Sequence, residues 1–175
     1  PQLQKNNFQP AFGAQIVKEG LTRFVLWAPG ARRVDVEVEG LPSVTMDQAD
    51  DGRATAEVAC EHDARYRYRV FDDENDEQGS LVPDPAARAQ AGDIDGPSVV
   101  IDPNHYQWKN TDWQGRPWHE TVLYELHVGT LGGFKGVRQH LPYLAELGVT
   151  AIELMPVSEF PGARNWGYDG VLPYA

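Results

Sequence analysis

The chain has 175 residues, and its 15 basic and 26 acidic side chains give a formal net charge of −11 at pH 7. This negative field repels phosphate backbones and anionic lipid, so composition disfavours nucleic-acid and membrane-surface partners. The 41% of hydrophobic residues suffices for the core of one domain or two small ones. The single Cys60 cannot form an intramolecular disulfide, and no apolar run approaches the roughly 18 residues that span a bilayer. Because the start also lacks the layout of a signal peptide, we expect a globular, cytoplasmic protein without a cofactor.

Short runs of alternating apolar and polar residues fill the first part of the chain. They are LTRFVLWA (21–28), VDVEV (34–38), ATAEV (54–58) and YRYRVF (66–71), separated by turn residues. Alternation with period two buries one face of a strand and leaves the other in water. We therefore predict an antiparallel, immunoglobulin-like β-sandwich over residues 1–103, without that fold's disulfide.

An acidic run and a tryptophan-bearing segment follow the last of these strands. The acidic run 72–77 predicts a solvated hairpin tip rather than a calcium site, because the glycine hinge and alternating ligand oxygens of a calcium loop are missing. Residues 104–120 carry Pro117 and three tryptophans, and we expect an ordered connector there. Such aromatic residues more often plug a domain seam than line a sugar surface.

The last third of the chain predicts a strand, a helix and a second strand. Residues 121–128 are nearly all apolar, as in a parallel strand covered on both faces. Apolar residues recur at helical spacing over 134–147, and Gly148 follows as a C-terminal cap. Residues 150–155 predict the second strand, which completes a βαβ unit. Pro142 predicts a kink or a late helix start, since it removes one backbone hydrogen bond.

Three features of this unit could belong to a functional site. The glycine-rich segment 129–136 lies where a phosphate-binding loop would, but its glycine register fits a turn better than a nucleotide site. Glu125 and Glu153 hold matching places on the two strands, as a glycosidase pair could. Carboxylates in strands more often make structural hydrogen bonds, however, and His127, although it could touch a substrate, is more often held by its neighbours.

The loop after the second strand carries ARNWGYDGV (163–171), with two aromatic side chains, an amide and a carboxylate between glycines. Ligands bind at the carboxyl ends of parallel strands, where this loop lies. Because an aromatic ring stacks on a pyranose while an amide and a carboxylate hold its hydroxyls, we predict sugar contacts from Tyr168, Asp169 and Asn165. Trp166 fits sugar contact and a cap on the end of the sheet equally well.

These motifs resemble a known family. The stretches VLYELHVGT, LPYLAELGVTAIELMPVSEFPG and NWGYDGV resemble the α-amylase superfamily of glycoside hydrolases, and within it the maltooligosyltrehalose trehalohydrolases, with glycogen branching enzymes next. YRYRV, VPDPAAR, GPSVVIDP and PNHYQWKNTDWQGRPW also fit. The resemblance implies an N-terminal β-sandwich of glycogen-branching type and, over residues 121–175, the first strands of a (β/α)8 barrel.

The resemblance also implies a site and a reaction. The family's Asp nucleophile, Glu acid/base and further Asp belong to later barrel strands, so no catalytic residue is assigned in this chain. Tyr168 and Asp169 match positions that contact the sugar at the cleaved bond. The implied reaction cleaves the α-1,4-glucosidic bond next to the terminal trehalose of maltooligosyl trehalose, with an α-glucan as partner and no metal or cofactor. A 1,4-α-glucan branching enzyme is the alternative, and a non-catalytic glucan-binding module that uses exposed aromatics such as Trp27 is another.

Two departures from the family pattern bear on these expectations. Relatives have several more residues between VGT and the first helix, whereas Leu131 follows at once. A (β/α)8 barrel needs about 250 residues of its own. Because of that length, and because two parallel strands and one helix leave edges and apolar faces uncovered, we expect an N-terminal fragment of a longer glycosidase that is inactive by itself.

Overall fold

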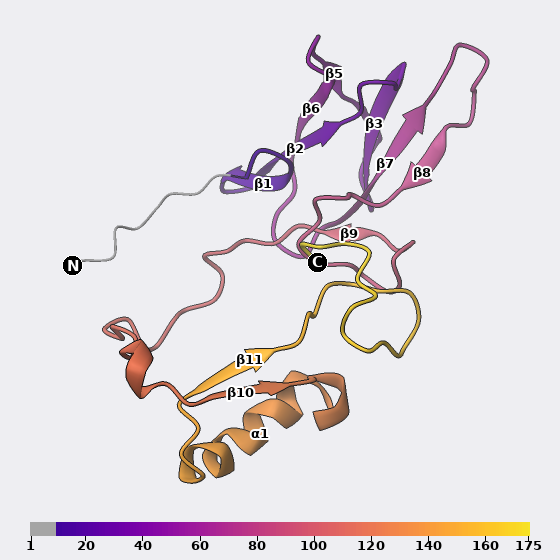
Figure 1. The fold of residues 1–175 in the computed structure, drawn as a ribbon. Helices are drawn as coiled ribbons and strands as arrows, with labels where there is room; N and C mark the ends of the chain where they lie inside the picture. The colour runs from indigo at the N-terminus through magenta and orange to yellow at the C-terminus, as the bar shows by residue number, and fades with distance from the viewer. Residues whose placement is uncertain (1–9) are drawn as a thin grey trace. The chain divides into compact units, whose positions relative to one another are not determined.

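The computed structural model describes residues 10–175 and divides into two compact units (Figure 1). The first consists of the chain up to His105 together with Leu172–Ala175, and the second of Tyr106–Val171. Each unit has its own hydrophobic cluster. Among the described residues, no helix combines the length and the apolar character that crossing a bilayer requires.

The first unit is built from two antiparallel sheets. One sheet has the order β1-β2-β6-β5, and the other has the order β4-β3-β7-β8 with β9 paired to β7. The strands are β1 (Gly13–Lys18), β2 (Leu21–Trp27), β3 (Arg33–Val38), β4 (Val44–Thr45), β5 (Asp47–Gln48), β6 (Arg53–Val58), β7 (Arg65–Phe71), β8 (Ser80–Val82) and β9 (Ser98–Val99). The four strands predicted from alternation are thus confirmed to within one residue at each end.

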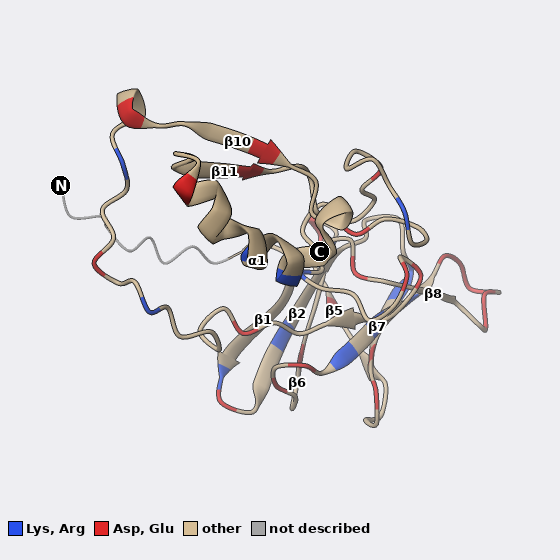
Figure 2. Cartoon of the chain, turned by 90° about the horizontal axis from the view of Figure 1, so that it is seen from below, with Lys and Arg blue, Asp and Glu red and all other residues tan. Residues whose placement is uncertain are grey.

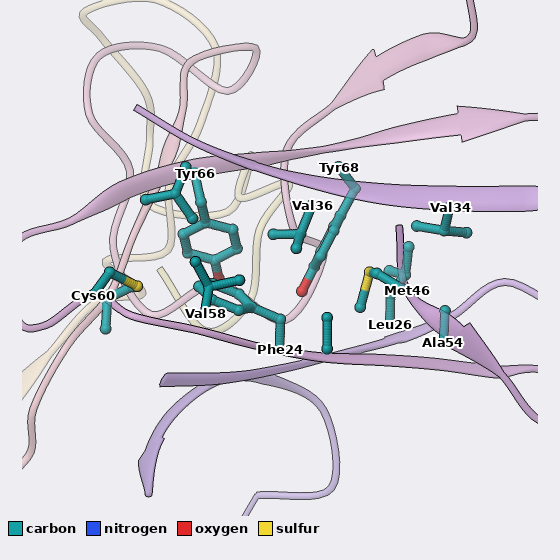
Figure 3. Packing of buried hydrophobic residues seen from close by; sticks show 13 residues of the cluster. Phe24, Leu26, Val34, Val36, Met46, Ala54, Val58, Cys60, Tyr66 and Tyr68 are labelled. Carbon is teal, nitrogen blue, oxygen red and sulfur yellow. The ribbon is translucent and has the colours of Figure 1, made fainter. Parts of the chain in front are cut away.

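Side chains from both sheets form one core (Figure 3). Phe24 of β2 packs edge-on against Tyr66 of β7, with ring centroids 4.8 Å apart. Along β7 Tyr66 and Tyr68 are buried while Arg65 is exposed, which is the predicted period of two. Removing a large side chain of this kind from water contributes about 1.5–3 kcal/mol, so the alternating pattern carries much of the stability of this unit.

The acidic run forms the tip between β7 and β8, and its carboxylates satisfy the turn itself. The Asp73 Oδ1 atom accepts hydrogen bonds from the backbone N–H groups of Asn75 (2.7 Å) and Asp76 (3.1 Å). The Asp76 Oδ1 atom accepts one from Gly79 (2.8 Å). Within residues 10–175, no group of three or more His, Cys, Asp or Glu side chains is arranged to hold a metal ion.

The second unit begins with the connector and continues as strand, helix and strand. Its elements are η1 (Trp118–Glu120), β10 (Leu123–Leu126), η2 (Gly129–Leu131), α1 (Gly133–Glu146) and β11 (Ala151–Leu154). β10 and β11 pair in parallel, with Leu123 opposite Ala151 and Leu126 opposite Leu154. The predicted strand–helix–strand order and the parallel pair are confirmed. Trp108, Trp113 and Trp118 are all exposed within this unit, so their role at a seam stays a prediction.

The helix differs from its sequence prediction in one respect and agrees in another. Pro142 lies inside α1, and the helix runs from Gly133 through it to Glu146, so a late helix start is wrong. Gly148 follows with a φ of +97°, as the predicted cap requires. Gly136, in the first turns of α1, serves close packing, because a Cβ atom there would lie 1.7 Å from the Leu131 carbonyl oxygen.

The coverage of β10 also differs from the prediction. Leu126 packs in a cluster with Val137 and Leu144 of α1. Leu123 and Tyr124, however, are 48% and 46% exposed. A single helix can cover only one face of the strand pair, and so β10 is not buried on both faces in the described unit.

Candidate functional site

The loops that follow β10 and β11 line an open cavity of about 880 Å³. Both loops lie at the carboxyl ends of the parallel strands, where α/β sheets bind their ligands. The cavity has the size typical of small-molecule sites. His127, Thr130 and Phe134 line it from the first loop and the start of α1, and Met155, Phe160, Arg164, Asn165, Trp166 and Asp169 line it from the second loop.

Three of the four predicted sugar-binding residues meet at this cavity. Asn165, Trp166 and Asp169 line it, and the Trp166 side chain is 85% exposed. Tyr168 is 70% exposed and is not among the residues that line the cavity. The contacts of all four residues with a sugar stay predictions.

A tight turn shapes the loop that carries these residues. The backbone N–H of Gly167 donates to the Asn165 side-chain Oδ1 atom. Gly167 has a φ of +97°, and a Cβ atom there would lie 3.2 Å from the Met155 Cε atom. The Asn165 side-chain oxygen is thus used within the turn, and the N–H groups are the part of this amide that could donate to a ligand.

His127 links the two loops. It lies directly after β10, and its Nε2 atom is 3.0 Å from the backbone oxygen of Asn165. Its Nδ1 atom accepts a hydrogen bond from the backbone N–H of Thr130 at 3.2 Å. The expectation that neighbours hold this histidine is therefore confirmed. Sequence reasoning did not identify Asn165 as the partner, which is 38 positions away.

Glu125 and Glu153 are direct neighbours in the parallel pair, on β10 and β11 (Figure 2). Both are exposed, and neither lines the cavity. Within the part of the chain that the structure describes, neither carboxylate has a hydrogen bond or an ion pair, so the expected structural hydrogen bonds are absent. The half-covered strand pair explains this difference, because these side chains can be solvated.

A second cavity, of about 480 Å³, lies in the first unit beside Trp27. Trp27 is 61% exposed, and its indole Nε1–H donates to the Asp51 backbone oxygen at 3.2 Å. Phe12, Arg53 and Pro85 also line this cavity. An exposed indole face beside an Arg and an Asp is chemically suited to a sugar ring and its hydroxyls.

Asp84 is a buried carboxylate that sequence reasoning missed. Its Oδ2 atom accepts hydrogen bonds from the hydroxyl groups of Tyr66 (2.6 Å) and Tyr68 (3.3 Å), and its Oδ1 atom accepts one from the Ala86 N–H (2.8 Å). Burial raises the pKa of Asp84, and the hydrogen bond from Tyr66 opposes that rise. Burial likewise raises the pKa of Tyr66 and Tyr68 above the usual tyrosine range. With every oxygen facing a donor, this carboxylate holds the segment after β8 against β7.

Comparison with known proteins finds relatives of the chain among curated sequences and solved structures. No family model matches it. The malto-oligosyltrehalose trehalohydrolase of Saccharolobus solfataricus is 40% identical over 168 residues, which cover 94% of this chain and 28% of that protein. That of Deinococcus radiodurans is 41% identical over 157 residues, covering 88% and 25%. The chain is homologous to the N-terminal region of the malto-oligosyltrehalose trehalohydrolases. It spans about 28% of the length of the first of these trehalohydrolases.

Solved structures agree with the relationship to these trehalohydrolases. A Salmonella typhimurium protein assigned as an alpha amylase has a TM-score of 0.87 and 43% identity, over 95% of this chain and 28% of that one. A pullulanase variant from Paenibacillus barengoltzii, complexed with maltotetraose, has a TM-score of 0.73 and 25% identity, over 93% of this chain and 31% of that one. The resemblance to α-glucan glycoside hydrolases noted in the sequence is thereby confirmed.

Proposed function

We propose that the chain forms the N-terminal part of a retaining α-glucan glycoside hydrolase that cleaves the α-1,4-glucosidic bond in maltooligosyl trehalose and releases trehalose. The observation that carries the proposal is the 40% identity to a trehalohydrolase over 94% of this chain. A cytoplasmic location and the absence of a cofactor, of a nucleic-acid partner and of a membrane partner are parts of the same proposal.

The architecture proposed for this function has three parts. We assign residues 1–103, of which the structure describes 10–103, to an immunoglobulin-like sandwich and residues 104–120 to a connector. We assign residues 121–175 to the start of a (β/α)8 barrel, with β10, α1 and β11 as its first strand, first helix and second strand. Two antiparallel sheets around one core support the first assignment. The parallel pair β10–β11 with α1 between its strands supports the last. The catalytic carboxylates then belong to later strands of the barrel, and none lies in this chain.

The substrate-binding assignment rests on the cavity of the second unit. Asp169 and Asn165 bring a carboxylate and an amide to the cavity, which suits the hydroxyl groups of a glucose unit. Trp166 presents an exposed indole face at the same cavity, and the ring of Tyr168, two positions later in the loop, is exposed as well. An α-glucan or maltooligosyl trehalose would thus be bound by polar contacts at its rim and by stacking on its apolar faces.

Product analysis tests the reaction and separates it from its nearest alternative. The protein that carries this chain is incubated with maltooligosyl trehalose and, separately, with amylose. Free trehalose from the first substrate without new α-1,6 linkages in the second is the expected result. New α-1,6 branches in amylose, with no trehalose released, would identify a branching enzyme instead.

A glucan-binding role for the first unit is a second candidate, favoured by the cavity beside Trp27. Affinity electrophoresis of the chain in a glycogen gel measures it, with Trp27→Ala and Trp108→Ala as a matched pair. Both indoles are exposed, but only Trp27 lines that cavity. If the first unit binds glucan, only the Trp27 variant loses retardation. Unretarded migration of the unchanged chain would count against this role.

A further inference from the structure

The imidazole of His127 is enclosed by groups from both loops of the cavity in the second unit. A Cβ atom added to Gly129 would lie 2.9 Å from the ring's Cε1 atom, and one added to Gly167 would lie 3.7 Å from its Cδ2 atom. The ring therefore fills space that two glycines leave open, one in each loop. Close packing of this kind limits the orientations open to the ring.

The hydrogen bonds of His127 determine which ring nitrogen carries the proton. The Thr130 backbone N–H can only donate, so the Nδ1 atom that receives it carries no hydrogen. The Asn165 backbone oxygen can only accept, so the Nε2 atom facing it at 3.0 Å carries the hydrogen. Only the neutral Nε2–H tautomer satisfies both partners.

Asn165 is thereby held at two points. Its backbone oxygen accepts the hydrogen bond from His127, while its side-chain Oδ1 atom accepts the N–H of Gly167. These bonds fix the turn that directly precedes Tyr168 and Asp169. Because protein groups occupy both nitrogens of His127, neither is free to exchange a proton with a substrate.

We propose that His127 is a positioning residue, whose Nε2–H ties the turn at residues 165–167 to the loop after β10 and so orients Asp169 and Tyr168 toward the sugar. The orienting role rests on the proposed function of those two side chains. The hydrogen bond between the two loops does not depend on that function, and its presence can be measured without any sugar.

Two amide variants separate the hydrogen bonds of this histidine. In His127→Gln the amide nitrogen lies near the place of Nε2 and can donate to the Asn165 oxygen. In His127→Asn the amide oxygen lies near the place of Nδ1 and can accept from Thr130, but the shorter side chain does not reach Asn165. Hydrogen exchange of the backbone amides of residues 165–169 is then compared in the unchanged chain and in both variants.

The expected result is faster exchange at Gly167 in His127→Asn, by about tenfold for the loss of one hydrogen bond, and near-unchanged exchange in His127→Gln. Exchange in α1 serves as the internal control. Equal exchange at Gly167 in all three proteins would overturn the proposal. If a variant does not fold, the ¹⁵N NMR spectrum of His127 in the unchanged chain tests the proposal instead, since it shows which ring nitrogen carries the proton. A proton on Nδ1 rather than Nε2 would also overturn the proposal.

The sugar-dependent part has its own measurement. In the protein that carries this chain, His127→Asn should lower kcat/KM for maltooligosyl trehalose, and His127→Gln should restore most of it. If exchange responds as expected but the unchanged protein releases no trehalose, the tie stands and the proposed function fails. If trehalose is released but both variants keep full kcat/KM, the orienting role is wrong and the proposed function stands.

Discussion

Replacing Tyr66 by Phe should destabilise the first unit more than replacing Tyr68 by Phe. Both rings are fully buried, and both substitutions remove one hydroxyl while the ring keeps its place in the core (Figure 3). Both hydroxyls donate to the same Asp84 oxygen, but Tyr66 does so at 2.6 Å and Tyr68 at 3.3 Å. The shorter bond is the stronger one, and its loss leaves a buried carboxylate oxygen with one long hydrogen bond.

The magnitude follows from the charge of the acceptor. A carboxylate that faces only donors is best satisfied in its ionised form, and a hydrogen bond to a charged group contributes about 1.5–3 kcal/mol. We therefore expect Tyr66→Phe to lower the free energy of unfolding by about 2 kcal/mol and Tyr68→Phe to lower it by less than about 1 kcal/mol.

Urea unfolding followed by tryptophan fluorescence measures both changes, and an unchanged m-value would show that the unfolding reaction stays the same. A Tyr68 variant that loses as much stability as the Tyr66 variant would refute the reasoning. So would a Tyr66 variant with the stability of the unchanged chain, because the 2.6 Å bond would then contribute nothing.

Three further predictions use other parts of the chain. Asp169→Asn should lower kcat/KM of the protein that carries this chain by at least about tenfold, because a charged hydrogen bond to the substrate is lost. Tm should stay unchanged because the side chain is exposed. A large fall in Tm would show that the role of Asp169 is structural. Gly167→Ala should lower Tm more than Gly148→Ala. Both glycines have a φ of +97°, which costs an alanine about 1–2 kcal/mol in strain, but only at Gly167 does a Cβ atom meet a neighbour, at 3.2 Å. Equal losses of Tm would contradict this prediction. Above about pH 10 the chain should lose stability, because burial raises the pKa of Tyr66 and Tyr68 and the unfolded chain releases protons that the folded one keeps. Tyrosinate absorbance showing that all seven tyrosines ionise near pH 10 while the chain stays folded would be the contrary result.

The strands that could be predicted from the sequence are those long enough to show several alternations of apolar and polar residues. β2, β3, β6 and β7 have six or seven residues each, so several alternations indicate the same buried face. β4, β5 and β9 have two residues each, and no period can be read from two positions. The βαβ unit was equally predictable, because its helix repeats apolar residues over fourteen positions between two apolar strands.

The contacts between distant segments could not be predicted in this way. Asp84 gains its role from tyrosines 18 and 16 positions earlier, and nothing in its local sequence indicates that their hydroxyls meet there. The candidate site shows the same limit. The composition of residues 163–171 indicated a binding loop, but the hydrogen bond from His127 to Asn165 depends on the pairing of β10 with β11. Local sequence also does not fix the direction of a side chain within a turn, so it could not predict that Asp169 lines the cavity while Tyr168 does not.

Trehalose release from maltooligosyl trehalose, by the protein that carries this chain, tests the central proposal most directly. The proposed function predicts free trehalose together with a maltooligosaccharide shortened by that unit, and a slower release of both by the Asp169→Asn variant. Intact maltooligosyl trehalose after prolonged incubation, from protein that is folded by circular dichroism, would contradict it.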